Sequence, residues 1–494
     1  MRTNSYFIGI DIGTTATKGV AFDDAGHVIG YRSVHYDMTH PRPDWAEQEP
    51  EPLWQAVLTC LDELVEKLGP ACQLIAFSTA MHSLMAIDEA GTPLTNFILW
   101  ADNRATAEAR DLLASELGLR LYRASGTPIH PMTPLCKLIW LRKNDPGLFA
   151  RTHRFIGIKE FIWHRFTGTY EIDYSVATAT GLFDLETSTW NRLALDTAGI
   201  TADQLATPVS PLRSFEFNVE RLGLKDGILT SKLKTLHSKL VIGASDGCLA
   251  NLGTGAITPG RVAITIGTSG AVRMASPGAA TDAQMRTFCY RLDDELFILG
   301  GGTNSGGAVF EWLYEQFFPG QTGDDVIARA ETVPPGADGL VFLPYLLGER
   351  APLWNAEAKG VFFGLTLRHT PTHLARAVLE GICLHTASLV RILEERQPVR
   401  EIYASGGFAK NTAWVQLLAD VCGKPVRLPE SVQAGAWGAV LLGMKSLGLI
   451  DSYDEKLDGL PIQETFYPHE KTTQTYRNLA DRFASLYEAT KSFM

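Results

Sequence analysis

The chain has 494 residues, 45% hydrophobic and 20% charged, a composition typical of a folded globular protein with more than one domain. Its 55 acidic and 44 basic side chains give a formal net charge of −11 without any basic block, which argues against a nucleic-acid-binding surface. No run of 18 apolar residues occurs, and the start MRTNSYFIGID has no apolar signal-peptide core, so we expect a cytoplasmic protein without a membrane partner.

The cysteine pattern favours reduced thiols. The seven cysteines are odd in number and form no C-x-x-C pair, which argues against disulfide and metal-binding roles. They are Cys60, Cys72, Cys136, Cys248, Cys289, Cys383 and Cys422. We expect most of these thiols to be buried.

The N-terminal stretch FIGIDIGTTATKGVAFDD combines an apolar strand, a Gly-Thr-Thr turn and a second strand. Gly13 permits a tight bend that points backbone N–H groups at an anion. The Thr14 and Thr15 hydroxyls add donors, and Lys18 adds positive charge. Asp11 would repel a phosphate there unless a divalent cation lay between them. The pattern predicts a nucleotide-phosphate hairpin with an Mg²⁺-handling aspartate, although an ordinary β-hairpin with a glycine turn fits it as well.

Several elements are predicted between this hairpin and residue 100. They are a third strand over 28–34 that completes an antiparallel meander, a proline-containing surface excursion over 36–52, a helix over about 52–68 and a strand over 73–87. His82, within Ala80-Met81-His82-Ser83, interrupts the last strand. A single histidine in such a setting is typical of a hydrogen-bonded core residue.

Polar side chains gather where the following strand ends. The segment WADNR contains Trp100, Asp102, Asn103 and Arg104. Packing alone does not readily explain three polar side chains and an indole at this position. They indicate a sugar-binding edge, because hydroxyl groups need both donors and acceptors.

The rest of the first half contains elements of less specific meaning. They are a rigid loop GTPIHPM over 126–132, a helix over 133–143 with Lys137, a strand and helix over 155–166 with Lys159, a small-residue segment DYSVATATG over 173–181, and a connection with edge strands over 210–238. The small residues of 173–181 should lie close to a ligand or to another backbone.

Residues 239–255 predict a strand, a glycine-flanked turn carrying Asp246, and a short helix. The segment GASDG is also a literal G-x-S-x-G, which predicts a nucleophile elbow with Ser245 as the nucleophile of a serine hydrolase. A hydrolase would need an HGGG-like oxyanion segment, which the chain lacks, and would leave the Gly-Thr hairpins unused. The hydrolase is therefore the remote alternative.

The first hairpin pattern recurs in the later half as RVAITIGTSGAVRMA, residues 261–275. Gly267 and Thr268 repeat Gly13 and Thr14 at an offset of 254 residues (267 − 13). This spacing predicts a duplicated domain, which we divide as 1–256 and 257–494. Two facing hairpins would clamp the two ends of a polyphosphate.

The later half adds a candidate nucleotide site. The predicted elements are a strand over 296–300 with a glycine loop over 301–307, a strand pair beginning at 360–364, a long helix over 373–395, a strand over 401–404, a small-residue helix over 433–443 and an amphipathic helix over 471–494. Glycines follow the strand at 401–404, with Phe408 and Asn411 nearby. This combination suits a flat base that needs stacking and hydrogen bonds at its edge.

Two longer patterns resemble signatures of the FGGY carbohydrate kinases, and the likeness covers essentially the whole chain. They are MTPLCKLIWLRKN at 132–144, and GVFFGL at 360–365 followed, after a seven-residue spacer, by HLARAVLE at 373–380. The literal FGGY string is absent, which is common in this family. The resemblance implies an α/β fold of two ribonuclease-H-like (actin-like ATPase) domains, with a cleft that closes over MgATP and a polyol.

The resemblance also implies roles for individual residues. Asp246 matches the catalytic base that takes the proton from the attacking hydroxyl, and Asp11 matches the metal-side aspartate, so both carboxylates are expected beside Mg²⁺. The residues expected to bind the nucleotide are Gly13, Thr14, Thr15, Lys18, Gly267, Thr268, Gly306, Gly407, Phe408 and Asn411.

Within the family, the segments AMHS, WADNR, GTPIHPM and IKE are most similar to gluconate kinases, and the Met-His pair also resembles xylulose kinases. The implied reaction is ATP-dependent phosphorylation of a terminal hydroxyl of D-gluconate to give 6-phosphogluconate. A carboxylate substrate requires a cation, and the candidates are Arg104, His130, Lys137 and Lys159. The full set of expected substrate residues is Met81, His82, Trp100, Asp102, Arg104, His130, Lys137, Lys159 and Asp246.

Two other functions stay open. A kinase for xylulose or another ketose or polyol is the alternative within the family. A sugar sensor or actin-like protein with the same clamp would bind ATP without sugar-dependent release of ADP. The only macromolecular partner that the sequence leaves open is a second copy of the chain, in a homodimer.

Overall fold

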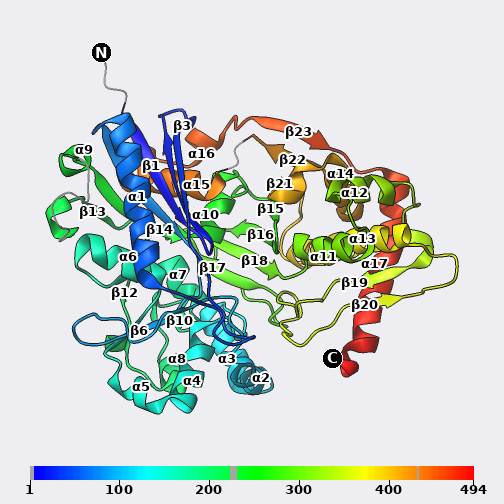
Figure 1. Ribbon diagram of the computed structural model, residues 1–494, viewed down its shortest axis with the longest axis horizontal. Coiled ribbons are helices and arrows are strands. Elements are labelled where there is room, and N and C mark those ends of the chain that lie inside the picture. Colours follow the sequence, from blue (N-terminus) through cyan, green and yellow to red (C-terminus); the bar gives the residue numbers. More distant parts are fainter. Residues whose placement is uncertain (1–4, 223–230, 431–432) are drawn as a thin grey trace.

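The structure is a computed structural model that describes residues 5–222, 231–430 and 433–494. Two α/β halves, each built on one large sheet, lie side by side in Figure 1. The first sheet has the order β13 (Ser214–Glu216), β14 (Lys239–Ser245), β5 (Cys72–Thr79), β1 (Tyr6–Ile12), β2 (Ala16–Phe22) and β3 (Val28–His35). The second has the order β17 (Phe288–Arg291), β18 (Phe297–Thr303), β16 (Gly270–Ser276), β15 (Arg261–Ile266), β21 (Glu401–Ser405), β22 (Val426–Pro429) and β23 (Ile462–Phe466).

The two sheets share one topology. In the first, β1, β2 and β3 form an antiparallel meander, and β5 and β14 follow in parallel with β1. In the second, β15, β16 and β18 form the meander, and β21 and β22 follow in parallel with β15. The repeated Gly-Thr turns join β1 to β2 and β15 to β16, so the duplication seen in the sequence is a duplication of the sheet. This is the arrangement expected of two ribonuclease-H-like domains.

Smaller sheets and helices surround this framework. The remaining strands are β4 (Glu47–Gln48), β6 (Met85–Ile87), β7 (Phe97–Ile98), β8 (Arg154–Ile156), β9 (Glu171–Asp173), β10 (Phe183–Asp184), β11 (Thr189–Trp190), β12 (Thr207–Val209), β19 (Val341–Leu343) and β20 (Val361–Phe363). The helices of the first half are α1 (Pro50–Leu68), α2 (Thr106–Leu113), α3 (Glu116–Ser125), α4 (Pro134–Asn144), α5 (Pro146–Arg151), α6 (Ile158–Thr167), α7 (Tyr174–Ala179), α8 (Arg192–Ala198), α9 (Ser231–Lys234) and α10 (Asp246–Gly253). Those of the second are α11 (Gly307–Phe317), α12 (Gly323–Glu331), α13 (Pro371–Glu394), α14 (Thr412–Cys422), α15 (Ala434–Ser446), α16 (Asp454–Leu457) and α17 (Glu470–Thr490). Within the described ranges, no helix combines the length and the apolarity that crossing a bilayer requires.

Helix α15 joins the halves, because it belongs to the later half of the chain but packs on α10 and on the first sheet (Figure 1). Its small residues permit backbone-to-backbone contact. A Cβ atom on Gly438 would lie 2.1 Å from the Leu249 carbonyl oxygen, and one on Gly9 would lie 2.2 Å from the Ala436 carbonyl oxygen. Residues of both halves, among them Phe22 and Tyr290, share one apolar cluster around this helix. The small-residue helix expected near 433–443 therefore serves tight packing, as predicted.

Four predicted elements differ from the structure. Helix α1 begins at Pro50 rather than Pro52, because proline is accepted in the first turn, where no N–H is needed. The strand expected over 73–87 is two strands in different sheets, β5 and β6, separated by a bend at which His82 has a φ of 67°. Strand β18 continues to Thr303, through glycines predicted as a loop, and β20 closes a pair with the earlier β19 rather than opening one.

The connection predicted over 210–238 lies only partly within the description. Strand β13 is an edge strand of the first sheet, as expected, whereas 223–230 lie outside the described residues. All seven cysteines are free, six of them buried and Cys422 partly exposed.

Candidate active site

A cavity of about 230 Å³ lies between the two halves. Its wall from the first half comprises Thr14, Ala80, Met81, His82, Trp100, Met132 and Asp246. Its wall from the second half comprises Thr265, Ser269, Gly270, Ala271, Arg273, Phe288, Tyr290, Gly302, Arg350 and Trp354. The turns of both hairpins and the GASDG segment therefore meet at one space, as the sequence predicted.

Sheet register explains why residues so far apart in sequence meet. The three neighbouring parallel strands β1, β5 and β14 end level with one another, because Ile12 pairs with Thr79 and Thr79 pairs with Ser245. The next residues, Gly13, Ala80 and Asp246, thus leave the same edge of the sheet. Ligands of open α/β sheets bind beyond the carboxyl ends of the strands.

Asp246 is the first residue of α10 and is partly exposed at the cavity. Its Oδ1 atom accepts a 2.6 Å hydrogen bond from the Gly247 backbone N–H, and no described cation forms an ion pair with it. Burial and the Asp11 carboxylate, against the opposing charge of Arg273, raise the pKa of Asp246 to about 6. The group is thus ionised at neutral pH but close to its titration range.

Asp11 lies at the end of β1, opposite Lys18 on β2. Its Oδ1 atom accepts a 2.6 Å hydrogen bond from the Ser78 hydroxyl, and α15 approaches so closely that a Cβ on Gly435 would lie 3.2 Å from Oδ1. Burial raises the pKa of Asp11, against the Ser78 hydrogen bond and the charge of Lys18. Two carboxylates that raise each other's cost of ionisation, neither in an ion pair with a described residue, suit a hard divalent cation such as Mg²⁺.

The turn of the first Gly-Thr hairpin is held by two side-chain hydrogen bonds. The Tyr36 hydroxyl donates to the Gly13 carbonyl at 2.7 Å, and the Trp100 indole Nε1–H donates to the Thr14 hydroxyl at 2.9 Å. The Thr15 side chain is exposed, and Thr14 is the turn residue that reaches the cavity wall. The turn is thus preorganised, with Trp100 supporting it as well as lining the cavity.

The turn of the second Gly-Thr hairpin lies between two cavities. Ser269 lines the cavity already described, whereas Gly267 and Thr268 line a second, more open cavity of about 560 Å³. The turn is fixed by the next helix, because the Gly307 N–H donates to the Gly267 carbonyl at 2.7 Å and the Ala308 N–H to the Thr268 carbonyl at 3.1 Å. A group bound at this turn would be accessible from both cavities.

The second cavity brings together the residues predicted for adenosine. Gly407, Phe408 and Asn411 line it, beside α11 and α12. The Asn411 side chain caps α14 by accepting from the Trp414 N–H at 3.2 Å, and its amide donates to the Asp324 carboxylate at 2.7 Å. Gly306 lies behind this wall rather than on it. A Cβ there would lie 2.7 Å from the Ser269 carbonyl carbon, so this glycine permits the close approach of the turn.

His82 is both a bonded core residue and part of the cavity wall. Its Nδ1–H donates to the Ala179 carbonyl at 2.8 Å, which leaves Nε2 as an acceptor 3.4 Å from the Tyr290 hydroxyl of the other half. Burial, aided by the charge of Lys137, lowers the pKa of His82 to about 3. The imidazole therefore stays neutral and can form hydrogen bonds without supplying charge.

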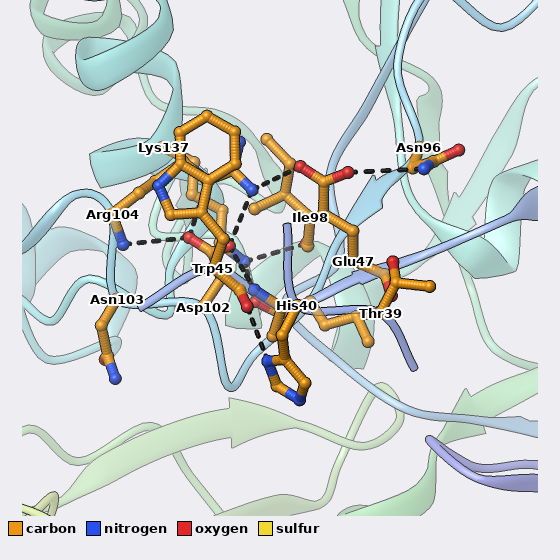
Figure 2. Close-up of polar contacts among 12 residues, drawn as sticks. Thr39, His40, Trp45, Glu47, Asn96, Ile98, Asp102, Asn103, Arg104 and Lys137 are labelled. Carbon is orange, nitrogen blue, oxygen red and sulfur yellow. Dashed lines mark hydrogen bonds and ion pairs between the residues drawn. The ribbon is translucent and has the colours of Figure 1, made fainter. Parts of the chain in front are cut away.

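Asp102 and Arg104 form a bonded cluster rather than a free binding edge (Figure 2). Arg104 donates to both oxygens of the buried Asp102 carboxylate at 2.8 Å, and its Nη2 also donates to Glu47 at 2.6 Å. Its guanidinium lies 3.6 Å from the Trp45 ring centre. Neither residue reaches the cavity wall.

The two candidate lysines also form hydrogen bonds with protein groups rather than facing the cavity. The Lys137 ammonium donates to the carbonyls of His82, Ile98 and Leu99 at 2.6, 3.1 and 2.7 Å. The Lys159 ammonium donates to three carbonyls at the ends of β5 and β14, and its Nζ lies 3.5 Å from the Asp173 carboxylate. Both side chains are buried away from the cavity wall, and their contacts hold the strand ends that carry the site.

His130 is the fourth residue predicted to bind the substrate carboxylate. Its Nδ1 accepts from the Met132 N–H at 3.2 Å, and its Nε2 has no hydrogen-bond partner among the described residues. Burial lowers the pKa of His130 to about 3, so the ring is a neutral donor beside the cavity residue Trp354. It supplies no positive charge, and it is not among the residues that line the cavity.

The sequence did not predict several residues of the cavity wall, among them its two arginines, Arg273 and Arg350. Arg273 stands in the repeated hairpin pattern, which was interpreted only for its turn, and Arg350 stands in a connection without a recognised motif. Alternation along β16 places Ala271 and Arg273 on the same side as the cavity, and this pattern could have identified Arg273.

The serine required by the hydrolase alternative is buried. Ser245 has no exposed surface and extended backbone angles, φ −69° and ψ 150°, at the end of β14. A nucleophile elbow instead presents an exposed serine on a strained turn. The GASDG segment thus presents its aspartate, and not its serine, to the cavity.

Models of two known domains match the chain. The N-terminal domain of the FGGY family of carbohydrate kinases matches residues 6–219, and the C-terminal domain of that family matches residues 262–447. The predicted division between residues 256 and 257 falls in the interval between the matches and stays a prediction.

Known proteins of similar sequence and structure are sugar and sugar-acid kinases. The chain is 40% identical to a gluconokinase of Bacillus licheniformis over 502 aligned positions, with 99% of this chain and 96% of that protein covered. The structures of a gluconate kinase and of a ligand-bound xylulose kinase, both from Lactobacillus acidophilus, superpose with TM-scores of 0.92 at 34% identity. The alignments cover 98% and 99% of this chain and 98% of each of those chains.

Proposed function

Because the chain belongs to the FGGY family of carbohydrate kinases, we propose that it transfers the γ-phosphoryl group of ATP to the terminal hydroxyl of D-gluconate, giving 6-phosphogluconate. The observation that carries this proposal is the meeting of Asp246 with the turns of both Gly-Thr hairpins at one cavity. Phosphoryl transfer requires positioning and electrostatic stabilisation more than covalent help from the protein.

In this proposal Asp246 is the general base. It accepts the proton of the sugar hydroxyl as that oxygen attacks phosphorus, and a pKa of about 6 makes it an effective base at neutral pH. The hydrogen bond from the Gly247 N–H fixes one carboxylate oxygen, which leaves the other available to the substrate. Asp11 and Asp246 would hold Mg²⁺, which supplies charge neutralisation of the phosphate oxygens when bound.

ATP would lie across the second hairpin. The 560 Å³ cavity accommodates adenosine beside Phe408 and Asn411, and the Gly267–Thr268 turn between the two cavities presents the triphosphate to the substrate. Thr14 on the first hairpin faces the same space from the other half. Closure of the halves would bring the two turns together on one phosphate chain.

Sequence identity favours gluconate over xylulose as the proposed substrate. The gluconokinase relative is 40% identical over nearly the whole chain, whereas the two kinase structures are equally similar and do not discriminate. The neutral His82 ring and the Trp100 side chain at the cavity wall suit a polyhydroxylated chain in either case.

A panel of ADP-release assays over gluconate, xylulose, glycerol, ribulose and fructuronate tests the proposal. We expect gluconate to give the highest kcat/KM, and ADP release without sugar to be negligible. Preference for xylulose would replace the substrate but keep the enzyme class, and ATP binding without sugar-dependent ADP release would favour the sensor alternative. The cytoplasmic location and the homodimer stay predictions.

A further inference from the structure

A sugar acid brings a carboxylate into the cavity, and this negative charge needs a cationic partner. The four candidates from the sequence do not supply one at the wall. Arg104, Lys137 and Lys159 already donate hydrogen bonds to protein acceptors, and His130 is neutral. The inference that follows rests on the proposed function, because it concerns how that function selects its substrate.

Arg273 is a cation at the cavity wall that lowers the pKa of Asp246 but has no hydrogen-bond or ion-pair partner among the described residues. It projects from β16, forms no hydrogen bond or ion pair within the described parts of the chain, and its Nε atom is fully buried. A Cβ atom on Gly247 would lie 3.0 Å from both Nε and Nη2, so the last glycine of GASDG makes room for this guanidinium. A buried donor without an acceptor is costly, which indicates that a ligand supplies the acceptor.

Arg350 presents a second guanidinium to the same cavity. Its Nε donates to the Asn304 side chain and its Nη2 to the Thr303 carbonyl, both at 2.9 Å, and the group lies 5.0 Å from the Trp100 ring centre. Its Nη1 atom has no hydrogen bond among the described residues and lies where a Cβ on Gly302 would be only 2.7 Å away. Arg350 is thus anchored by two nitrogens with the third directed at the glycine-lined wall.

The two guanidiniums repel each other. Burial and the charge of Arg273 both lower the pKa of Arg350. Asp246, the acidic group of this wall, is not in an ion pair with either arginine, and it is needed to accept a proton. An anionic ligand group between the arginines would remove the repulsion and satisfy the free N–H donors.

We propose that Arg273, with Arg350 beside it, binds the carboxylate of the sugar-acid substrate and sets the preference of the cavity for acids over neutral polyols and ketoses. Guanidinium groups suit this task, because their planar N–H pairs match both carboxylate oxygens. Arg273 stands four residues beyond Ser269, roughly 13 Å along an extended strand, which separates its backbone from the turn that faces the nucleotide cavity.

The test compares Arg273→Gln, Arg350→Gln and Arg273→Lys with the unmodified protein. For each we would measure the Kd of gluconate by calorimetry, that of glucitol, which has a hydroxymethyl group in place of the carboxylate, and that of a fluorescent ADP analogue. Steady-state kcat and KM for gluconate complete the set. Arg192→Gln is the matched control, because the Arg192 side chain is 94% exposed in a loose 3.8 Å pair with Asp196.

We expect Arg273→Gln to weaken gluconate binding by about 10- to 100-fold, the loss of a charge-assisted hydrogen-bonded pair, and to raise KM more than it lowers kcat. Glucitol and nucleotide binding should change less than about twofold, and Arg273→Lys should restore part of the loss because the charge returns. Arg350→Gln should give the same pattern, accompanied by some loss of stability, because it also releases Thr303 and Asn304.

Three outcomes would overturn the proposal. They are unchanged gluconate binding in Arg273→Gln, an equal loss for gluconate and glucitol, and a fall in kcat with unchanged KM, which would place Arg273 on the transferred phosphoryl group. An unmodified protein that turns over no sugar acid would instead refute the proposed function. The two failures are therefore distinguishable.

Discussion

At the scale of single residues, the site contains charged groups whose burial lowers the stability of the folded protein. Asp11 and Asp246 both have raised pKa values, and Arg273 has no hydrogen-bond or ion-pair partner among the described residues. Such costs are typical of functional sites, where charge is arranged for the ligand rather than for the folded protein. The substitutions that follow separate function from stability at these positions.

Replacing Asp246 by Asn should reduce kcat by roughly 10²- to 10⁴-fold, because the amide cannot accept the hydroxyl proton. ATP affinity should be largely retained, since in the proposed complex adenosine and most of the triphosphate would contact the other half. Coupled ADP-release kinetics and a nucleotide-binding titration would check this. A kcat close to that of the unmodified protein would remove Asp246 from the role of base.

The same substitution should stabilise the metal-free protein at alkaline pH. Because the pKa of Asp246 is raised from 3.8 to about 6 in the folded state, the folded protein binds this proton more tightly, and stability falls as pH rises between those values. Above about pH 6 the full penalty is present. Asn should therefore add about 1–2 kcal/mol at pH 8, less than the full shift implies because the side chain is partly exposed, and nothing at pH 3.5. Urea denaturation at both pH values measures the difference, and an equal gain at both would contradict this cause.

Lys137→Met tests the positioning role of a buried lysine. Methionine leaves the carbonyls of His82, Ile98 and Leu99 without their donor, and we expect a loss of about 2–4 kcal/mol in urea denaturation. KM should rise alike for acidic and neutral substrates, because the loop that carries His82 loosens. Lys67→Met, at an exposed position in the last turn of α1, is the control and should cost less than about 1 kcal/mol. A rise in KM confined to gluconate would instead show that Lys137 binds the carboxylate.

At the scale of elements, glycine positions determine how closely helices and strands approach. Helices α10 and α15 contact each other through backbone on both sides, since a Cβ on Gly253 would lie 2.0 Å from the Ala434 carbonyl oxygen and one on Gly438 would lie 2.1 Å from that of Leu249. No side-chain rotation relieves such a clash, so one helix must move.

Gly438→Ala should therefore destabilise the protein by about 1–3 kcal/mol and lower Tm, despite the higher helix propensity of alanine. Thermal unfolding followed by circular dichroism would measure this. Gly278→Ala is the control, because no atom lies within 4 Å of its Cβ position and it should change Tm little. An unchanged or higher Tm for Gly438→Ala would show that the helices can separate without cost.

Some of these elements could be predicted from the sequence and others could not. The hairpins, the meander and the helix over 371–394 were predictable, because alternation, turn residues and apolar spacing are local patterns. The break between β5 and β6 was not, because Gln73 to Ile87 contains no Gly, Pro, Asn or Asp to mark a turn, and the bend at His82 depends on tertiary contacts such as that with Ala179. The same holds for the site. Its glycine turns were recognisable from the sequence. The hydrogen bonds of Lys137 and Lys159 to carbonyls, and the lack of a partner for Arg273 among the described residues, depend instead on residues remote in sequence.

At the scale of the whole molecule, the two halves share a core. The cluster around α15 joins residues of the first sheet, such as Phe7 and Leu74, to Phe288 and Tyr290 of the second. At the outer edge, the Lys456 ammonium donates to the Asp24 carbonyl at 2.8 Å, which ties α16 to the turn between β2 and β3. The halves are thus joined along one side and meet at the cavity on another.

We expect the protein to unfold in one thermal transition, with calorimetric and van't Hoff enthalpies in agreement, because neither half retains this cluster alone. Residues 1–256 expressed alone should lack cooperative unfolding, since α15 would be absent from the first sheet. Differential scanning calorimetry of the full chain and of this fragment would test both statements. A fragment that melts cooperatively near the Tm of the full chain would show that the shared cluster is dispensable.

The burial of the native thiols makes the molecule suitable for chemical labelling. Burial raises the pKa of Cys60, Cys136 and Cys289 to about 11, and that of Cys72, Cys248 and Cys422 to about 12, so at pH 7 only about one such thiol in 10⁴ or fewer carries the reactive negative charge. A maleimide dye should therefore select a cysteine introduced at the outer surface of each half, with no native position removed. Energy transfer between two such dyes would then follow, in real time, how far the halves approach each other as nucleotide and sugar acid bind.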